Sequence, residues 1–157
     1  MTFQTILAGL AVVAKSFHHE ELLEQATTSS FDTLFKLGEK PPRDKGDASL
    51  HADIDKMNRR LGLYSDDSIL NMQRTREKKI VITLSLYANL GHVLSAVKPT
   101  LIGDISLRMV DLSLSNGLVP SSPFGFAYYG GVLLANGSVK EGCRLGKYLA
   151  GCLFPLK

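Results

Sequence analysis

The chain has 157 residues, enough for one domain of ordinary size, and 45% of them are hydrophobic while 21% are charged. This balance is typical of globular proteins and favours neither a disordered chain nor a membrane protein. The formal charge of +3, from 18 basic and 15 acidic residues, is too small an excess to indicate a nucleic-acid or membrane partner.

Apolar residues recur at helical spacing along the sequence, and we predict about seven helices. The first, over about residues 2–16, contains a nine-residue apolar run with no basic residue before it. This favours a buried amphipathic helix over a secretory signal. The second helix runs from about residue 19 to Gly38, and the following Pro41-Pro42 forbid its continuation. We therefore expect an N-terminal helical pair over 1–38 and a linker over 39–46.

The middle of the chain predicts two helices separated by a short turn. One starts near Asp47, which we expect to be its N-cap, and Asp66 or Asp67 caps the turn that follows it. The next helix, over about residues 76–97, is apolar around much of its circumference. Such a helix must be covered on more than one side, so we predict that it is an inner helix of a stacked array.

The helix predicted over about residues 99–116 has the clearest amphipathic pattern. Its apolar stripe lies opposite Asp104, Arg108 and Asp111, and Asn116-Gly117 supply a left-handed stop. We expect this polar side to face solvent.

The last two helices, over about residues 122–135 and 138–154, carry small residues on one face of each. We expect Ser122 to cap the first of them, and Ser138 with Glu141 to form a capping box at the second. Glycine inside a helix costs about 1 kcal/mol relative to alanine, and close approach of two helix backbones offsets that cost. We therefore predict an antiparallel hairpin whose contact is made by four glycines: Gly130, Gly131, Gly142 and Gly146.

The fold class predicted from these patterns is all-α. Antiparallel hairpins would stack as a degenerate tetratricopeptide-like array, with residues 47–157 as one helical-repeat segment that continues the array of 1–38.

The C-terminal part of the chain resembles the helical-repeat region of very large signalling proteins. The resemblance is carried by four segments: Met109–Gly117, Ser121-Ser122-Pro123, Phe126–Gly130 and Gly142–Lys147. Those proteins join a protein-kinase-like domain and an AAA-type ATPase module to the repeat region, often followed by GAF and histidine-kinase domains. The resemblance implies a regulatory spacer, or a surface for partner proteins or adjoining signalling domains. Because this chain contains neither neighbour, it would be a fragment, a truncated relative or a free-standing adaptor.

Residue types that carry chemistry are present, but none forms a specific motif. Gly142–Lys147 is one residue too short for a phosphate-binding loop, and His18-His19 with Glu20-Glu21 lack a further metal ligand nearby in sequence. We expect no cofactor, no metal and no catalytic activity. The alternative is a small enzyme of unknown reaction, with a site assembled around three residues: His92, Cys143 and Asp104.

Binding to a protein partner is the function that these patterns favour. Aromatic side chains can anchor peptides in a repeat groove, so Tyr128 and Tyr129 are candidates for an interaction surface, together with Asp104, Arg108 and Asp111. A basic cluster is interpreted instead as a solvated helix start: Arg74, Arg76, Lys78 and Lys79.

Cysteine usage and the chain's apolar end give two further expectations. Cys143 and Cys152 lie about 13 Å apart along one predicted helix, which is too far for a disulfide. Two free thiols fit a reducing compartment and favour a cytoplasmic location. The apolar end, Leu153–Leu156, predicts self-association through exposed array ends.

Overall fold

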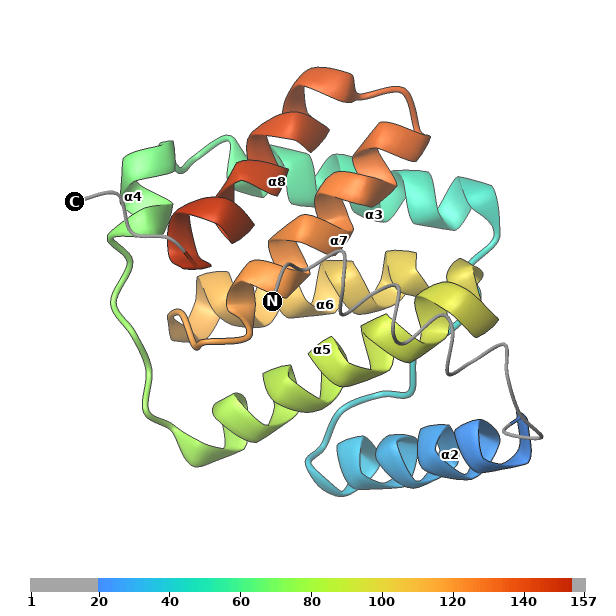
Figure 1. Ribbon diagram of the computed structural model, residues 1–157. Helices are drawn as coiled ribbons and strands as arrows, with labels where there is room; N and C mark the ends of the chain where they lie inside the picture. Colours follow the sequence, from blue (N-terminus) through green and yellow to red (C-terminus); the bar gives the residue numbers. More distant parts are fainter. Residues whose placement is uncertain (1–19, 154–157) are drawn as a thin grey trace. The chain divides into compact units, whose positions relative to one another are not determined.

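The computed structural model describes residues 20–153, and the helix expected over 2–16 lies outside this part of the chain. The described part contains seven α-helices, one short 3₁₀ helix and no strand, which confirms the all-α prediction (Figure 1). The chain divides into two compact units, residues 1–41 and 42–157, and this boundary falls inside the segment predicted as a linker. In the first unit, α2 (Glu20–Lys36) is followed by Gly38, whose φ of 83° is the left-handed conformation expected after a helix end.

The second unit carries the other helices. In chain order these are α3 (Asp47–Leu61), α4 (Asp66–Leu70), α5 (Lys78–Val97), the 3₁₀ helix η1 (Pro99–Leu101), α6 (Ile102–Asn116), α7 (Ser122–Ala135) and α8 (Val139–Leu153).

Three of the predicted helix caps are wrong by one or two residues. Gly46 occupies the N-cap of α3, so Asp47 lies in the first turn. Ser65, and neither Asp66 nor Asp67, caps α4, because its Oγ accepts a hydrogen bond from the backbone N–H of Ser68. At the start of α7 the N-cap is Ser121, and the hydroxyl of Ser122 is turned back to accept a bond from the N–H of Val119.

Helix α6 lies at the centre of the second unit, between α5 and α7, and also packs on α3 (Figure 1). Nine of its fifteen residues are buried, including two serines whose hydroxyls bond to carbonyls of the preceding turn. The expectation of an inner helix therefore fits α6 better than α5, whose Ile82 is 48% exposed. One side of α5 is nevertheless buried, at Leu84, Tyr87 and Leu94.

By length and composition alone, α5 would also qualify as a membrane span. About 44% of that stretch is buried inside the protein, and the core helix of a water-soluble protein passes the same test. Its composition alone therefore does not assign the chain to a membrane.

Helices α7 and α8 form the predicted hairpin, turning at Gly137 with a φ of 82°. A Cβ on Gly130 would lie 2.8 Å from the carbonyl oxygen of Gly142, and a Cβ on Gly142 would lie 2.7 Å from that of Gly130. These two glycines confirm the predicted close approach. Gly131 and Gly146 are exposed and a Cβ would meet open space at both, so the structure contradicts a need for small residues there. Stacking of such hairpins as a tetratricopeptide-like array stays a prediction.

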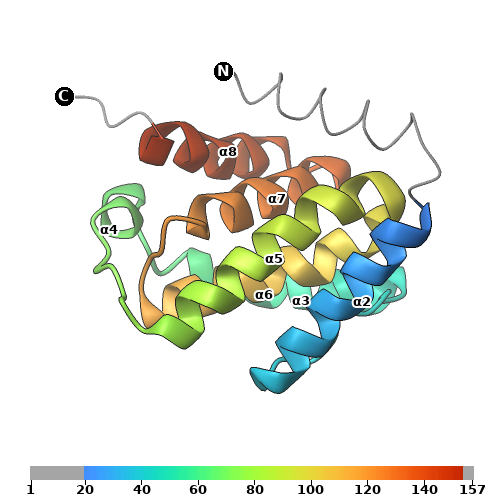
Figure 2. The same ribbon diagram turned by 60° about the horizontal axis from the view of Figure 1, so that its bottom comes forward.

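Helix α4 is the shortest α-helix of the second unit and lies beside the C-terminal half of α8 (Figure 2). The segment after it, residues 71–77, is fixed by a short parallel bridge to the α6–α7 connection. The N–H of Leu118 donates to the carbonyl of Gln73 at 3.0 Å, and the N–H of Thr75 donates to the carbonyl of Leu118 at 3.1 Å. Gly117 precedes the bridge with a φ of 99°, and a Cβ there would lie 2.5 Å from the oxygen of Gln73. The glycine predicted as a helix stop therefore also permits this contact.

Candidate functional site

Three of the predicted interaction residues meet at the edge where α6 faces α3. Asp104 accepts a bond from the N–H of Arg43 at 2.9 Å, and its other oxygen lies 2.7 Å from Nζ of Lys45. Burial lowers the pKa of Lys45, but hydrogen bonds to Asp104 and Asp53 outweigh this effect and raise the pKa above its usual value. The polar side of α6 is thus half-buried and paired, where the sequence predicted a solvated face.

Further along this edge, Asp111 binds two arginines. Its carboxylate pairs with Arg60 of α3 and with Arg108 of α6, the latter at 2.8 Å, and Arg60 also donates to Oγ of Ser115 at 2.9 Å. Together with the Lys45 pairs, these contacts line a cavity of about 260 Å³, whose apolar lining is Met57 and Leu107. We call it the α3–α6 groove, with these lining residues: Lys45, Asp53, Lys56, Met57, Arg60, Asp104, Leu107, Arg108 and Asp111.

The two tyrosines predicted as peptide anchors are used inside the fold. Tyr129 is fully buried, and its hydroxyl lies 2.8 Å from Oδ1 of Asn58 and 3.2 Å from the carbonyl oxygen of Ile54. The structure therefore contradicts a surface role for Tyr129, because α3 covers this side of α7. Burial raises the pKa of Tyr129 well above its ordinary value.

Tyr128 is half-buried and packs between α7 and α5. Its hydroxyl donates toward the carbonyl of Ala88 at 3.1 Å and lies 2.9 Å from Nδ1 of His92. A Cβ on Gly91 would overlap the Tyr128 ring, so this glycine makes room for it. The tyrosine thus joins two helices within the second unit.

The residues of the alternative enzyme site have separate surroundings. His92 of α5 makes edge-to-face contacts with Phe124 and Tyr128, and burial lowers the pKa of its imidazole. Asp104 lies in the α3–α6 groove with Lys45, and Cys143 is exposed on α8. Among the described residues there is also no group of three or more His, Cys, Asp or Glu side chains that could hold a metal ion.

A polar cluster that the sequence did not suggest joins α4 to α8. One oxygen of Asp66 accepts bonds from the hydroxyl of Tyr148 at 2.7 Å and from Nε of Arg144 at 2.6 Å. These two hydrogen bonds lower the pKa of Asp66, the tyrosine contributing most. Burial, followed by the bond to Asp66, raises the pKa of Tyr148 to about 12. Arg144 also binds Glu141 at 2.8 Å.

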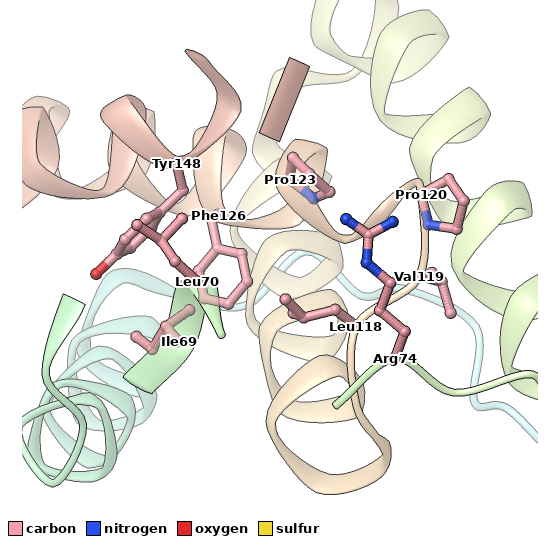
Figure 3. A pocket seen from close by; sticks show the side chains of 9 residues that line it. All are labelled: Ile69, Leu70, Arg74, Leu118, Val119, Pro120, Pro123, Phe126 and Tyr148. Carbon is pink, nitrogen blue, oxygen red and sulfur yellow. The ribbon is translucent and has the colours of Figure 1, made fainter. Parts of the chain in front are cut away.

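Beside this cluster lies a cavity of about 200 Å³ that we call the Arg74 pocket. It is lined by the nine residues labelled in Figure 3, which come from α4, the 71–77 segment, the α6–α7 connection, α7 and α8. All are apolar except Arg74 and the hydroxyl of Tyr148. In Figure 3 the Arg74 guanidinium lies near Pro120 and Pro123, whereas the Tyr148 hydroxyl points to the opposite side, toward Asp66.

The only sequence signal for this pocket was the basic cluster that includes Arg74, which was interpreted as a solvated helix start. The pocket's apolar residues are drawn from segments up to about eighty positions apart, so no local pattern could have identified it. Comparison with protein families, curated proteins and solved structures finds no match for this chain.

Proposed function

We propose that this chain is a non-catalytic helical interaction segment whose partner-binding surface is the α3–α6 groove. The observation that carries the proposal is the groove itself, which places carboxylates and cations of α3, α6 and the 42–46 segment over buried Met57 and Leu107. Charged groups around a small apolar floor are the arrangement that gives protein interfaces their specificity and their association rate.

The signs of the charges suggest what kind of partner would fit. Four cations and three carboxylates line the groove, and Lys56 at its rim is exposed with no ion pair among the described residues. A protein segment that carries both acidic and basic side chains would complement this surface better than a uniformly charged polymer would. Binding of this kind weakens as salt concentration rises, because rim charges are screened.

Residues whose side chains could take part in catalysis are engaged in contacts within the fold, which supports a non-catalytic role. His92 contacts Tyr128 of α7, and Asp104 contacts Lys45 of the 42–46 segment.

The resemblance to signalling proteins suggests that the partner is an adjoining domain or a separate signalling protein in the cytoplasm. Self-association through the apolar C-terminal segment of the array, residues 153–156, is part of the same proposal.

Site-specific photo-crosslinking tests the groove. A benzophenone amino acid at Lys56, on the groove rim, should give one discrete adduct in an extract of the source cells. The same probe at Lys98, which is exposed at the end of α5 and lies outside the groove, should not give that adduct. The Lys56 adduct should weaken in about 0.5 M salt.

A charge variant separates recognition from chance capture. Arg108→Ala removes a groove cation and should weaken the Lys56 adduct, whereas Arg76→Ala, outside the groove, should leave it unchanged. Circular dichroism checks that both variants keep the wild-type helix content. Failure to form an adduct, or adducts of equal yield from Lys56 and Lys98, would rule out the groove as the binding surface.

A further inference from the structure

We propose that the Arg74 pocket binds a small organic acid, one carboxylate carried on an aryl or branched alkyl group. This site is separate from the α3–α6 groove and does not rest on the proposed function. None of the pocket's residues lines the groove.

The apolar lining sets the size and character of the ligand's tail. Leu118 and Phe126 are buried at the base, and Leu70 lies at the rim with 43% of its surface exposed. A cavity of roughly 150 Å³ is large enough to hold benzene. The 200 Å³ here therefore accepts one ring with a short chain, or a branched alkyl group of similar volume.

The single cation sets the charge of the ligand's head. Arg74 is exposed, and its guanidinium forms no hydrogen bond or ion pair among the described residues. Asp66, in the polar cluster beside the pocket, is bonded to Arg144 and Tyr148. A guanidinium presents parallel N–H donors that match the two oxygens of a carboxylate.

Neighbouring charges add to the attraction for an anion. Arg76, Lys78 and Lys79 follow within five positions and are all exposed. Glu77 is the only acidic residue among them. Three exposed cations this close to Arg74 in sequence favour the approach of small anions.

The backbone on both sides of Arg74 is held in place before any ligand arrives. Gln73 and Thr75 each form a backbone hydrogen bond with Leu118, a residue that also lines the pocket. The backbone around Arg74 and that of Leu118 therefore form one hydrogen-bonded unit. A pre-organised site of this kind loses less entropy on binding than a mobile loop would.

Titration of the full chain followed by NMR tests the proposal, with 3-phenylpropanoate as the probe and its neutral amide as the matched control. The acid should shift the methyl resonances of Ile69, Leu118 and Val119 in a saturable way, with a Kd on the order of 1 mM for a ligand of this size. The amide should bind about tenfold more weakly, because it loses the charge-assisted hydrogen bonds to Arg74.

Two pairs of variants test which residues bind the ligand's carboxylate and which bind its apolar tail. Arg74→Gln should weaken the acid about tenfold and leave the amide unchanged, whereas Arg76→Gln should have little effect on either. Leu70→Gln should weaken both ligands, whereas Leu63→Gln changes an exposed leucine outside the pocket and should weaken neither. All four positions are exposed, so the fold should tolerate each change.

Three results would overturn the inference. One is shifts that do not saturate, and another is equal affinity for acid and amide in the wild-type chain. The third is an affinity for a short peptide ending in phenylalanine more than tenfold above that of the free acid, which would replace the small acid with a protein chain end.

Discussion

Single glycines decide how closely α7 and α8 approach each other. Gly130→Ala should lower the free energy of unfolding by about 1–3 kcal/mol, because its methyl group would press on the carbonyl of Gly142 and the helices would have to separate. Gly131→Ala is the matched control on the next residue of the same helix. A Cβ there meets open space, so the variant should be as stable as the wild type or gain up to about 1 kcal/mol of helix propensity. Urea denaturation measures both, and equal effects would show that backbone contact does not limit this hairpin.

A half-buried histidine, His92, should make stability depend on pH in a window set by its shifted pKa. Burial lowers the pKa of His92 below 6.5, so the unfolded chain takes up its proton first as pH falls. The contribution of His92 to the free energy of unfolding should therefore be constant above pH 7 and should decline as pH falls below 6.5. His92→Gln should flatten that decline, whereas His51→Gln, at an exposed position of α3, should keep it. Denaturation curves between pH 7.5 and about 5 provide the comparison, and an unchanged slope in His92→Gln would refute the assignment.

At the scale of whole helices, α4 depends on one carboxylate for its polar contacts with α8. Asp66→Asn removes the charge that Arg144 and Tyr148 share, so amide hydrogen exchange in 66–72 should become several-fold faster. The loss of overall stability should stay within about 1 kcal/mol, since Asp66 is largely exposed to solvent. Asp67→Asn is the matched control in the same helical turn, because the Asp67 carboxylate makes no ion pair among the described residues. Similar exchange rates in the two variants would mean that helix-end charge, and not the Asp66 contacts, holds α4.

The same helices indicate which parts of this fold a sequence can predict. The small-residue faces of two consecutive helices pointed to Gly130 and Gly142, but they pointed equally to Gly131 and Gly146, where the structure needs no glycine. Gly117, predicted as a helix stop, does end α6 with a positive φ that glycine favours. The Asp66–Arg144 contact joins positions 78 residues apart, and no periodicity encodes such a pairing. Tyr129 shows a subtler limit. Adjacent tyrosines lie about 100° apart around a helix, and the pattern alone does not decide which of them is buried. The position of α3, which the sequence does not give, decides that Tyr129 is buried.

Across the second unit, the candidate sites show the same difference between residues on one helix, which a sequence pattern can identify, and contacts between distant segments, which it cannot. Asp104, Arg108 and Asp111 lie on one side of α6 as the amphipathic pattern predicted, but their partners Lys45 and Arg60 come from segments that the pattern did not place beside them. The Arg74 pocket is wholly a product of packing, since α4, α7 and α8 each contribute only part of its wall. Sequence patterns therefore indicated the candidate residues of α6, and packing determined what they bind.

The order in which helices of the second unit contact one another has a consequence for how this unit folds. Helices α5, α6, α7 and α8 each pack on the next helix along the chain, so their contacts close only short loops. The contact of α3 with α6 must instead close a loop that contains α4 and α5, and a longer loop carries a larger entropic barrier. We therefore expect α5 to α8 to assemble first and α3 to dock late. On this order the α3–α6 groove is completed in the last step of folding.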